Sequence, residues 1–189
     1  MAEGIWATWY DLAQGVTSEA RQQFLDWTHE VYCPYLRAQP GYTWVAHYRH
    51  TGGGPQMEKV KTTAVGRTQD AIGSGNDYLL LVGGLSAHNF FKPSIKDAVL
   101  PEGFDARLSQ RTGLRTAVFT VEASVNGPAP REHGPGTGPG PAIQMGSFRM
   151  RTPEEEFDLG RWYAQYRLPF MAQLTGCIAT RDRKSTRLN

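Results

Sequence analysis

The length and composition of the chain are those of a folded globular protein. Of its 189 residues 40% are hydrophobic and 20% charged, which is apolar enough to bury a core and excludes disorder for most of the chain. The net charge is +2, and the last eight residues hold three of the 20 basic side chains against one of the 18 acidic ones. The remaining body is neutral, so charge gives no reason to expect nucleic acid or an anionic membrane as a partner.

No targeting or membrane segment is predicted. The first residues lack the basic and apolar stretches of a signal peptide, and no apolar run approaches the roughly 18–20 residues of a spanning helix. We therefore expect a cytoplasmic protein that has no contact with a membrane. Cys33 and Cys177 stand far apart at no metal-binding spacing, so we interpret them as buried thiols.

The first predicted elements are a strand and a long amphipathic helix. Residues 5–12 are β-branched or aromatic at most positions, and both faces of this strand are expected to be at least half buried. Thr17 or Ser18 caps the helix that follows. Its apolar stripe is formed by residues at helical spacing, namely Phe24, Trp27, Val31 and Tyr35, with Tyr32 and Leu36 beside them. Pro34 must kink or restart this helix because it lacks an N–H group.

The next segments predict three further strands and a broken second helix. Residues 42–50, 77–85 and 114–125 have strand composition, and 86–113 contain a helical stretch around 104–110. Residues 57–76 are interpreted as a short strand or an irregular insertion. The resulting order is β-α-β-β-α-β, the order of a ferredoxin-like unit.

A linker divides the chain. Ten of the fifteen residues from 127 to 141 are Gly or Pro, which indicates a segment that does not pack. A strand is predicted at 143–150, and Thr152, Pro153 and Glu155 fit the N-cap, N1 and N3 positions of a second long helix. The next strand is expected to begin at 177–181.

The last eight residues, 182–189, match the translation of a common DNA-sequencing adapter, GATCGGAAGAGCACACGTCTGAAC. We therefore expect them to be a non-native tail that follows a truncated natural chain. The alternative is a genuine basic tail.

The two long helices share a pattern that predicts an internal repeat. W-x6-P-[YF]-[LM]-x4-G occurs twice, and the two copies lie 135 residues apart. Its fixed positions are Trp27, Pro34 and Gly41 in the first copy and Trp162, Pro169 and Gly176 in the second. A shared proline and a shared exit glycine at one spacing favour duplication over chance.

These helices resemble those of the EthD-like members of the dimeric α+β barrel superfamily. The first helix supplies the tryptophan, the proline and Pro40-Gly41, but Val31 occupies the family's usual histidine position and His29 lies two residues earlier. The second helix has Tyr166-Arg167 where the family has Glu-His.

The resemblance implies an α+β fold in which tandem ferredoxin-like repeats form a pseudo-dimeric α+β barrel. Residues 1–126 would be the first repeat, 127–142 the linker, 143–181 the start of an incomplete second repeat and 182–189 the tail. Members of this superfamily include cofactor-free oxygenases, isomerases, haem enzymes and small-molecule sensors, so the fold does not fix the function.

His29 and Tyr10 are the candidate catalytic residues. His29 lies near the proline with Asp26 and Cys33 about one turn to either side, so it is suited to act as a general base, or it points outward.

Further polar and aromatic residues are candidates for substrate binding. His47 and Arg49 share a strand face and could bind a carboxylate or enolate, or they form a solvated strand end. The remaining candidates could wall an apolar pocket or belong to the core, and they are Trp9, Tyr32, Tyr163 and Arg167.

No metal site and no cofactor are expected. The histidines and cysteines form no H-x3-H or C-x2-C motif, and the chain has no phosphate-binding glycine loop, although haem on a lone histidine stays open. The leading hypothesis is a barrel that binds a small apolar or aromatic molecule, with cofactor-free oxygenase or isomerase chemistry left open. The alternative is a non-catalytic ligand-binding or assembly module, and both leave room for a homo-oligomer.

Overall fold

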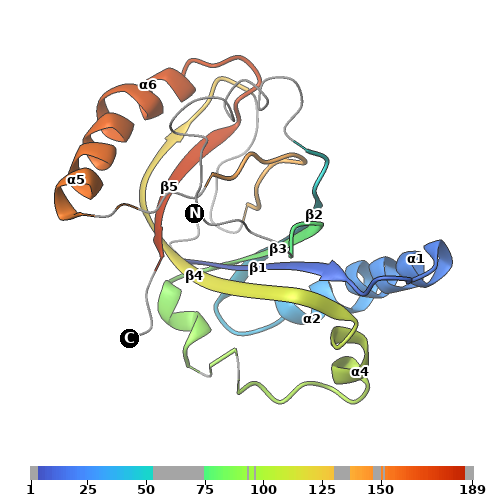
Figure 1. Ribbon diagram of the computed structural model, residues 1–189. Coiled ribbons are helices and arrows are strands. Elements are labelled where there is room, and N and C mark those ends of the chain that lie inside the picture. Colours follow the sequence, from blue (N-terminus) through green and yellow to red (C-terminus); the bar gives the residue numbers. More distant parts are fainter. Residues whose placement is uncertain are drawn as a thin grey trace.

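The chain folds as an α+β protein around one antiparallel sheet. In the computed structural model, residues 4–52, 75–92, 94–95, 97–129, 137–146, 150 and 152–185 are described. The sheet has the strand order β2-β3-β1-β4-β5, with β1 (Gly4–Leu12) at its centre (Figure 1). The other strands are β2 (Tyr42–Arg49), β3 (Tyr78–Gly84), β4 (Arg111–Asn126) and β5 (Ala179–Ser185). The predicted insertion at 57–76 lies almost wholly outside the described residues.

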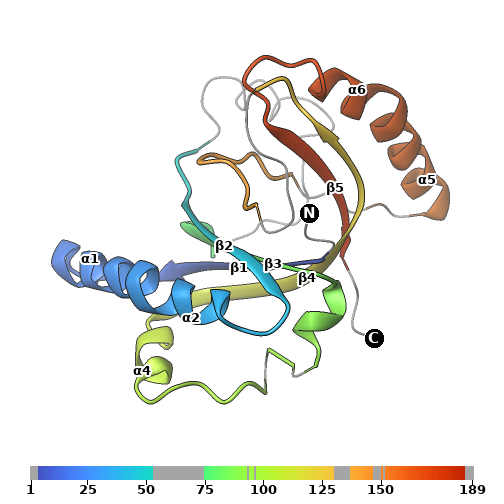
Figure 2. The ribbon, with the colours of Figure 1, turned by 180° about the vertical axis from the view of Figure 1, so that it is seen from behind.

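The first long helix lies on one face of this sheet. It consists of α1 (Ser18–Trp27), a π-helical turn η1 (Thr28–Tyr32) and α2 (Cys33–Arg37), and it connects β1 to β2 across the intervening β3 (Figure 2). Thr17 caps it as predicted, since its Oγ1 accepts a hydrogen bond from the Ala20 amide at 3.1 Å. The helix restarts at Cys33, one residue before Pro34.

The buried face of this helix differs from the predicted stripe. Phe24, Thr28, Tyr32 and Leu36 are buried, whereas Val31 is 41% exposed. In a regular α-helix a four-residue step overshoots one turn by about 40°, so three such steps drift by about 120°. The π-turn accommodates about one extra residue, which reverses most of this drift and keeps the four-residue repeat on one side. The sequence prediction was wrong here because it assumed a uniform period.

Aromatic residues fill the space between this helix and the rest of the chain. Phe104, the first residue of α4 (Phe104–Leu108), places its ring edge-on to Trp27 and Tyr35, with ring centres 5.2 and 5.1 Å apart. Phe90, in the short 3-10 helix η3 (Ala87–Phe90), is fully buried beside Trp6 and Tyr42. The broken second helix that the sequence predicts thus consists of two short pieces.

The opposite face of the sheet is also buried. Ile5, Ala7, Trp44 and Leu81 form a second core cluster, with Trp9 and Ile143 packed against it. Trp44 lies directly over Gly83, where an added Cβ would meet the indole ring, so only glycine fits at this position. As predicted, β1 is buried on both sides.

Residues 137–146 are described, and they cover the end of the predicted linker and the start of the strand predicted after it. Residues 143–146 do not form the predicted strand, and 147–149 lie outside the described residues. Instead the segment packs on the second core cluster: the Tyr48 hydroxyl donates a hydrogen bond to the Gly140 carbonyl at 2.8 Å, and Gly138 lies in contact with Trp44. Ile143 is therefore partly buried by packing, not by strand pairing.

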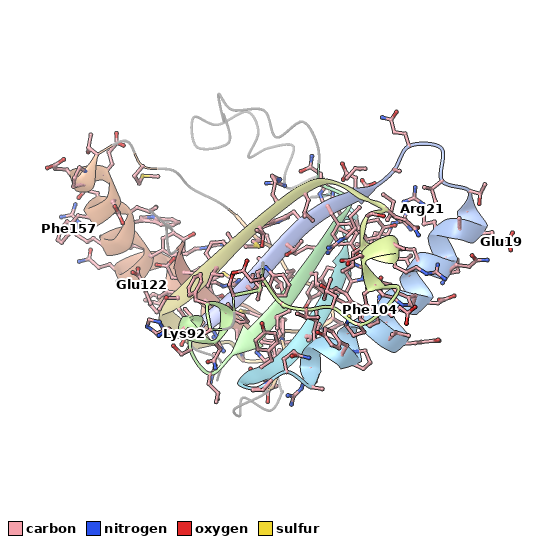
Figure 3. All side chains as sticks on the ribbon, turned by 90° about the horizontal axis from the view of Figure 1, so that it is seen from below. Glu19, Arg21, Lys92, Phe104, Glu122 and Phe157 are labelled. Atoms are coloured by element: carbon pink, nitrogen blue, oxygen red, sulfur yellow. The ribbon has the colours of Figure 1, made fainter. Side chains whose placement is uncertain are left out.

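The second long helix repeats the pattern of the first. α5 (Pro153–Trp162), the π-turn η4 (Tyr163–Arg167) and α6 (Leu168–Met171) begin 135 residues after α1, η1 and α2. Thr152 caps it as predicted, because its Oγ1 accepts from the Glu155 amide. Gly41 and Gly176 follow the two helices with φ of 78° and 83°, a conformation that favours glycine. This helix lies along the β4–β5 end of the sheet, far from α1, and Figure 3 shows Phe157 and Phe104 at opposite ends of the sheet.

β4 joins the two ends of the sheet. Its first part pairs with β1 and its second part with β5, and the register shifts between Val121 and Ala123. Residues 182–185, which we expected to belong to a non-native tail, are the end of the paired strand β5; their origin stays a prediction. In the described part of the chain no helix has the length and apolar character of a membrane span.

Asp11 binds the backbone of the three residues that precede β3. Its carboxylate accepts hydrogen bonds from the amides of Gly75, Asn76 and Asp77 at 2.6 to 2.8 Å. Burial alone would raise the pKa of Asp11, but these amides and the Arg115 charge outweigh it and hold the pKa below its ordinary value. Arg115 also donates to the Gly75 carbonyl at 2.8 Å, so the loop is held from both sides.

We predict that Asp11→Asn lowers the free energy of unfolding by about 1–2 kcal/mol at pH 7, because charge-assisted hydrogen bonds are lost. The depressed pKa stabilises the fold above the unfolded pKa, and this contribution disappears as the pH falls through the folded pKa. The difference from wild type should therefore shrink near pH 3 in denaturant titrations. Asp26→Asn, at an exposed carboxylate that accepts from Gln22, is the control and should change little. Equal effects of the two substitutions at pH 7 would contradict this role.

Candidate functional site

His29 is placed by the π-turn of the first helix. It directly follows the buried Thr28, whose hydroxyl donates to the Phe24 carbonyl at 2.8 Å. π-Turns inside α-helices occur frequently at functional sites. His29 itself is exposed, and its ring reaches the sheet at β2.

Three of the predicted residues form a continuous hydrogen-bonded chain. His29 Nε2 lies 2.9 Å from His47 Nδ1, and His47 Nε2 lies 2.7 Å from the Tyr10 hydroxyl. The residues come from η1, β2 and β1, so three separate elements build the chain. It leads from the exposed surface at His29 to Tyr10, which is only 1% exposed.

Stacked rings fix the inner part of this chain. The rings of Tyr10 and His47 are nearly parallel, with an interplanar angle of 4° and centres 5.8 Å apart. Tyr78 stacks on both rings, at 5.4 Å from Tyr10 and 5.6 Å from His47. Arg21 of α1 donates to the Tyr78 hydroxyl at 3.1 Å, which ties the stack to the helix. These contacts leave His47 little freedom to rotate.

A cation lies beside the stack. The Arg111 guanidinium carbon is 5.5 Å from the Tyr10 ring centre and 6.0 Å from that of Tyr32, both at cation–π distance. Arg111 is held by a hydrogen bond from its Nε to the Leu108 carbonyl at 3.2 Å. Tyr32, predicted as a binding residue, therefore lies beside the chain but is buried.

Burial sets the protonation states of the inner groups. It lowers the pKa of His47 to about 4, and the charges of His29 and Arg111 act in the same direction. Burial also raises the pKa of Tyr10 above its ordinary value, although Arg111 opposes the shift. Burial raises the pKa of the Cys33 thiol to about 11. At neutral pH the inner end of the chain is thus a neutral imidazole and a neutral phenol.

This arrangement suits general-base chemistry at His29. If His29 Nε2–H donates to His47 Nδ1, its Nδ1 is left to accept a proton from a ligand. In this arrangement the neutral His47 carries its proton on Nε2 and donates it to the Tyr10 hydroxyl. Since burial disfavours a charged His47, the accepted proton stays on the exposed His29 and can be returned to the product.

The other predicted residues lie elsewhere. Trp9 is on the opposite face of the sheet, where the Arg115 guanidinium lies 5.3 Å from its ring centre. Arg49 is exposed at the end of β2, outside the stacked cluster. Tyr163 and Arg167 belong to η4 in the second helix, where burial raises the pKa of Tyr163. The hydrogen-bonded chain Tyr10–His47–His29 includes none of these four residues.

Sequence reasoning missed Tyr78, Arg111 and Arg21. Tyr78 begins a strand that was recognised as buried, and it pairs with Tyr10 in the sheet register. Two adjacent central strands that carry tyrosine at their ends are a pattern that strand pairing would have revealed. Arg111 begins β4, and nothing in its sequence neighbourhood indicated the contact.

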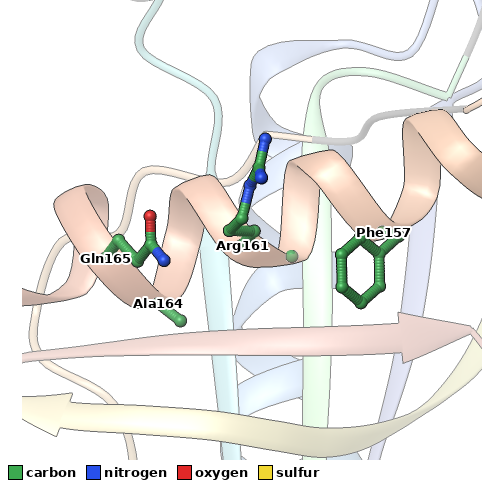
Figure 4. A pocket seen from close by; sticks show the side chains of 5 residues that line it. Phe157, Arg161, Ala164 and Gln165 are labelled. Carbon is green, nitrogen blue, oxygen red and sulfur yellow. The ribbon is translucent and has the colours of Figure 1, made fainter.

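An open depression lies on the second helix. Its volume is about 520 Å³, and it is lined by Phe157, Gly160, Arg161, Ala164 and Gln165 (Figure 4). Ala164 stands 135 residues after His29, so this helix has no imidazole at the equivalent position. The depression is therefore chemically unlike the histidine site.

Comparison with known proteins gives no assignment for the chain. No protein-family model, curated protein or solved structure matches it. Within the described ranges no group of three or more His, Cys, Asp or Glu side chains is placed to hold a metal ion. The site is thus interpreted from its own geometry.

We predict that His47 stays neutral down to about pH 4, so its Hε1 resonance should titrate there in NMR spectra. A histidine with a depressed pKa binds its proton more readily in the unfolded chain. Stability should therefore fall as the pH drops from about 6.5 towards 4. His47→Gln should remove this part of the pH dependence. Titration of His47 at an ordinary histidine pKa would contradict the buried, stacked environment.

Proposed function

We propose that this protein binds a small apolar or aromatic, enolisable molecule beside the first helix and moves a proton on it without a cofactor. The observation that carries the proposal is the hydrogen-bonded chain from exposed His29 through His47 to buried Tyr10. A surface histidine held by a neutral inner histidine has the geometry of an oriented general base. Isomerisation by proton transfer and cofactor-free oxygenation both begin with such a proton abstraction.

The residues around the hydrogen-bonded chain Tyr10–His47–His29 support an apolar substrate. Tyr10, Phe24, Tyr32 and Tyr78 form a buried aromatic wall behind the histidines, and Cys33 is largely neutral beside them. These rings are buried and do not contact a ligand, but they make the base of the site beneath the histidines apolar, which fits an apolar or aromatic body better than a charged one. Arg111 is engaged with the rings of Tyr10 and Tyr32.

The fold proposed for this function is a barrel of two tandem repeats. Its support is the match between the two long helices, which share a capping threonine, a π-turn, a proline and an exit glycine at the same offset. The strand order β2-β3-β1-β4 fits one ferredoxin-like unit, and β5, which follows the second helix as β2 follows the first, would belong to the second unit. In such a barrel β4 would be the last strand of the first repeat, and β5 would belong to the second.

A non-catalytic binding or assembly module is the second candidate. The rings beneath the histidines fill their space, since Tyr10 and Tyr78 are buried in mutual contact. The depression described above lies on the second helix, away from His29. In this alternative the chain Tyr10–His47–His29 would only connect the helix to the sheet.

We predict that the protein accelerates exchange of the α-protons of 1-phenyl-1,3-butanedione in D2O, and that His29→Ala lowers this rate at least about 100-fold, the usual contribution of a general base. Exchange is followed by NMR. Because His29 is exposed, the variant should keep its thermal stability. Tyr10→Phe should lower the rate less, since it affects only the orientation of His47.

His88→Ala is the matched control, because His88 is an exposed histidine on η3, outside the aromatic cluster. It should exchange the probe at the wild-type rate. If His29→Ala retains wild-type exchange, the general-base role is wrong. If the wild-type protein binds the diketone without exchange, the binding module is favoured.

A further inference from the structure

A segment rich in glycine and proline lies on one face of β2. Residues 137–141 have the sequence TGPGP and adopt neither helical nor strand conformation. Figure 1 and Figure 2 show this segment beside β2, on the side of the sheet away from α1 and α2. Trp44 and Tyr48 of β2, with Ala46 between them, belong to the core cluster on this side. We call these two aromatic residues the β2 aromatic strip.

The contacts of the strip with this segment involve mostly the backbone of the segment. The Tyr48 hydroxyl donates a hydrogen bond to the Gly140 carbonyl at 2.8 Å. Gly138 lies against Trp44, and a Cβ added at Gly138 would be 3.6 to 3.9 Å from Trp44 atoms, an ordinary contact distance. Ile143 adds one apolar side chain to the core cluster. The strip therefore recognises features that other glycine- and proline-rich segments share.

The prolines favour an extended conformation of the segment. Pro139 and Pro141 fix their own φ at about −65°, and each disfavours the helical conformation of the glycine before it. Neither Gly138 nor Gly140 has the positive φ that glycine often adopts in turns. Such sequences favour the polyproline II conformation, whose carbonyl groups form no internal hydrogen bonds. The Gly140 carbonyl can therefore accept from Tyr48 without losing a partner within the segment.

Aromatic residues that bind an extended proline-rich segment are a known mode of peptide recognition. Such peptides dock on aromatic-lined surfaces of several domain types, because their conformation is already formed and little entropy is lost on binding. The contact on β2 has the same components, which are aromatic rings, a ring hydroxyl that donates to a carbonyl, and prolines on both sides of the bonded glycine. Pro141 and Ala142 stay exposed, and one neutral hydrogen bond contributes only about 1 kcal/mol. The segment is thus weakly held.

We propose that the β2 aromatic strip is a recognition site for extended proline-rich peptides, which residues 137–143 of the same chain occupy until such a peptide displaces them. The strip and His29 lie on opposite faces of the sheet, so the proposal does not depend on the proton transfer proposed above. The covalent link gives the resident segment an effective concentration on the order of 1 mM. A separate peptide should therefore bind well only when the resident segment is released.

Binding of a labelled peptide with the sequence of residues 137–146 tests the proposal by fluorescence anisotropy with the full chain. Ile143→Asp should release the resident segment, because a carboxylate is unfavourable in the apolar cluster, and should raise the affinity for the peptide about 10-fold or more. Gly138→Asp should have the same effect, because its charged side chain would lie against Trp44. Ala142→Asp, at an exposed position of the same segment, is the matched control and should bind the peptide like wild type.

Two further changes test what the strip recognises. A peptide in which both prolines are replaced by alanine should bind Ile143→Asp about 5-fold more weakly or worse, because the free peptide is less ordered. Tyr48→Phe, added to Ile143→Asp, should weaken binding about 2- to 10-fold, the effect of one neutral hydrogen bond. Tyr42→Phe, on the other face of β2, is its matched control.

Three results would overturn the proposal. The first is that the peptide binds neither Ile143→Asp nor Gly138→Asp. The second is that the alanine peptide binds as tightly as the proline peptide, because the strip would then not recognise the extended conformation. The third is equal binding to wild type and to both released variants, because the resident segment would then not compete for the strip.

Discussion

The described fold depends on how the first long helix keeps one face towards the sheet. Its buried residues, Phe24, Thr28, Tyr32 and Leu36, recur every four positions. A regular α-helix would rotate this repeat away from the sheet, and the π-turn before Pro34 prevents it. The same turn leaves His29 at the edge of the buried face, within reach of β2. The backbone irregularity and the candidate site thus have one origin.

Burial separates the two histidines into different roles. His47 is surrounded by Tyr10, Tyr78 and Arg111, and this environment disfavours its charged form. His29 bonds to it from the exposed side. A pair of like residues in unlike environments is a common way to build an acid–base site, because the proton has one preferred position. In the proposed mechanism the aromatic stack therefore acts on the chemistry without contacting the ligand.

The sequence predicted the features that depend on local physics. Thr17 and Thr152 were recognised as helix caps, and the strands 5–12 and 77–85 were recognised from their composition. Val31 was misplaced because a π-turn has no sequence pattern of its own. Tyr10, His29 and His47 were chosen one by one, but their contact depends on the register of β1, β3 and β2, which is non-local. Arg111 was missed for the same reason.

The two ends of the sheet are connected mainly through the long strand β4, so the resistance of the sheet to bending differs along its width. Only Phe119 and Thr120 of this strand are paired with β1 and β5 at once. On either side of these two residues β4 has one partner strand, and the register shift follows at Val121. A force that pulls the two ends of the sheet apart would therefore pass through the covalent backbone of β4, with few lateral hydrogen bonds to share it. Bending between the two ends should concentrate at this short overlap.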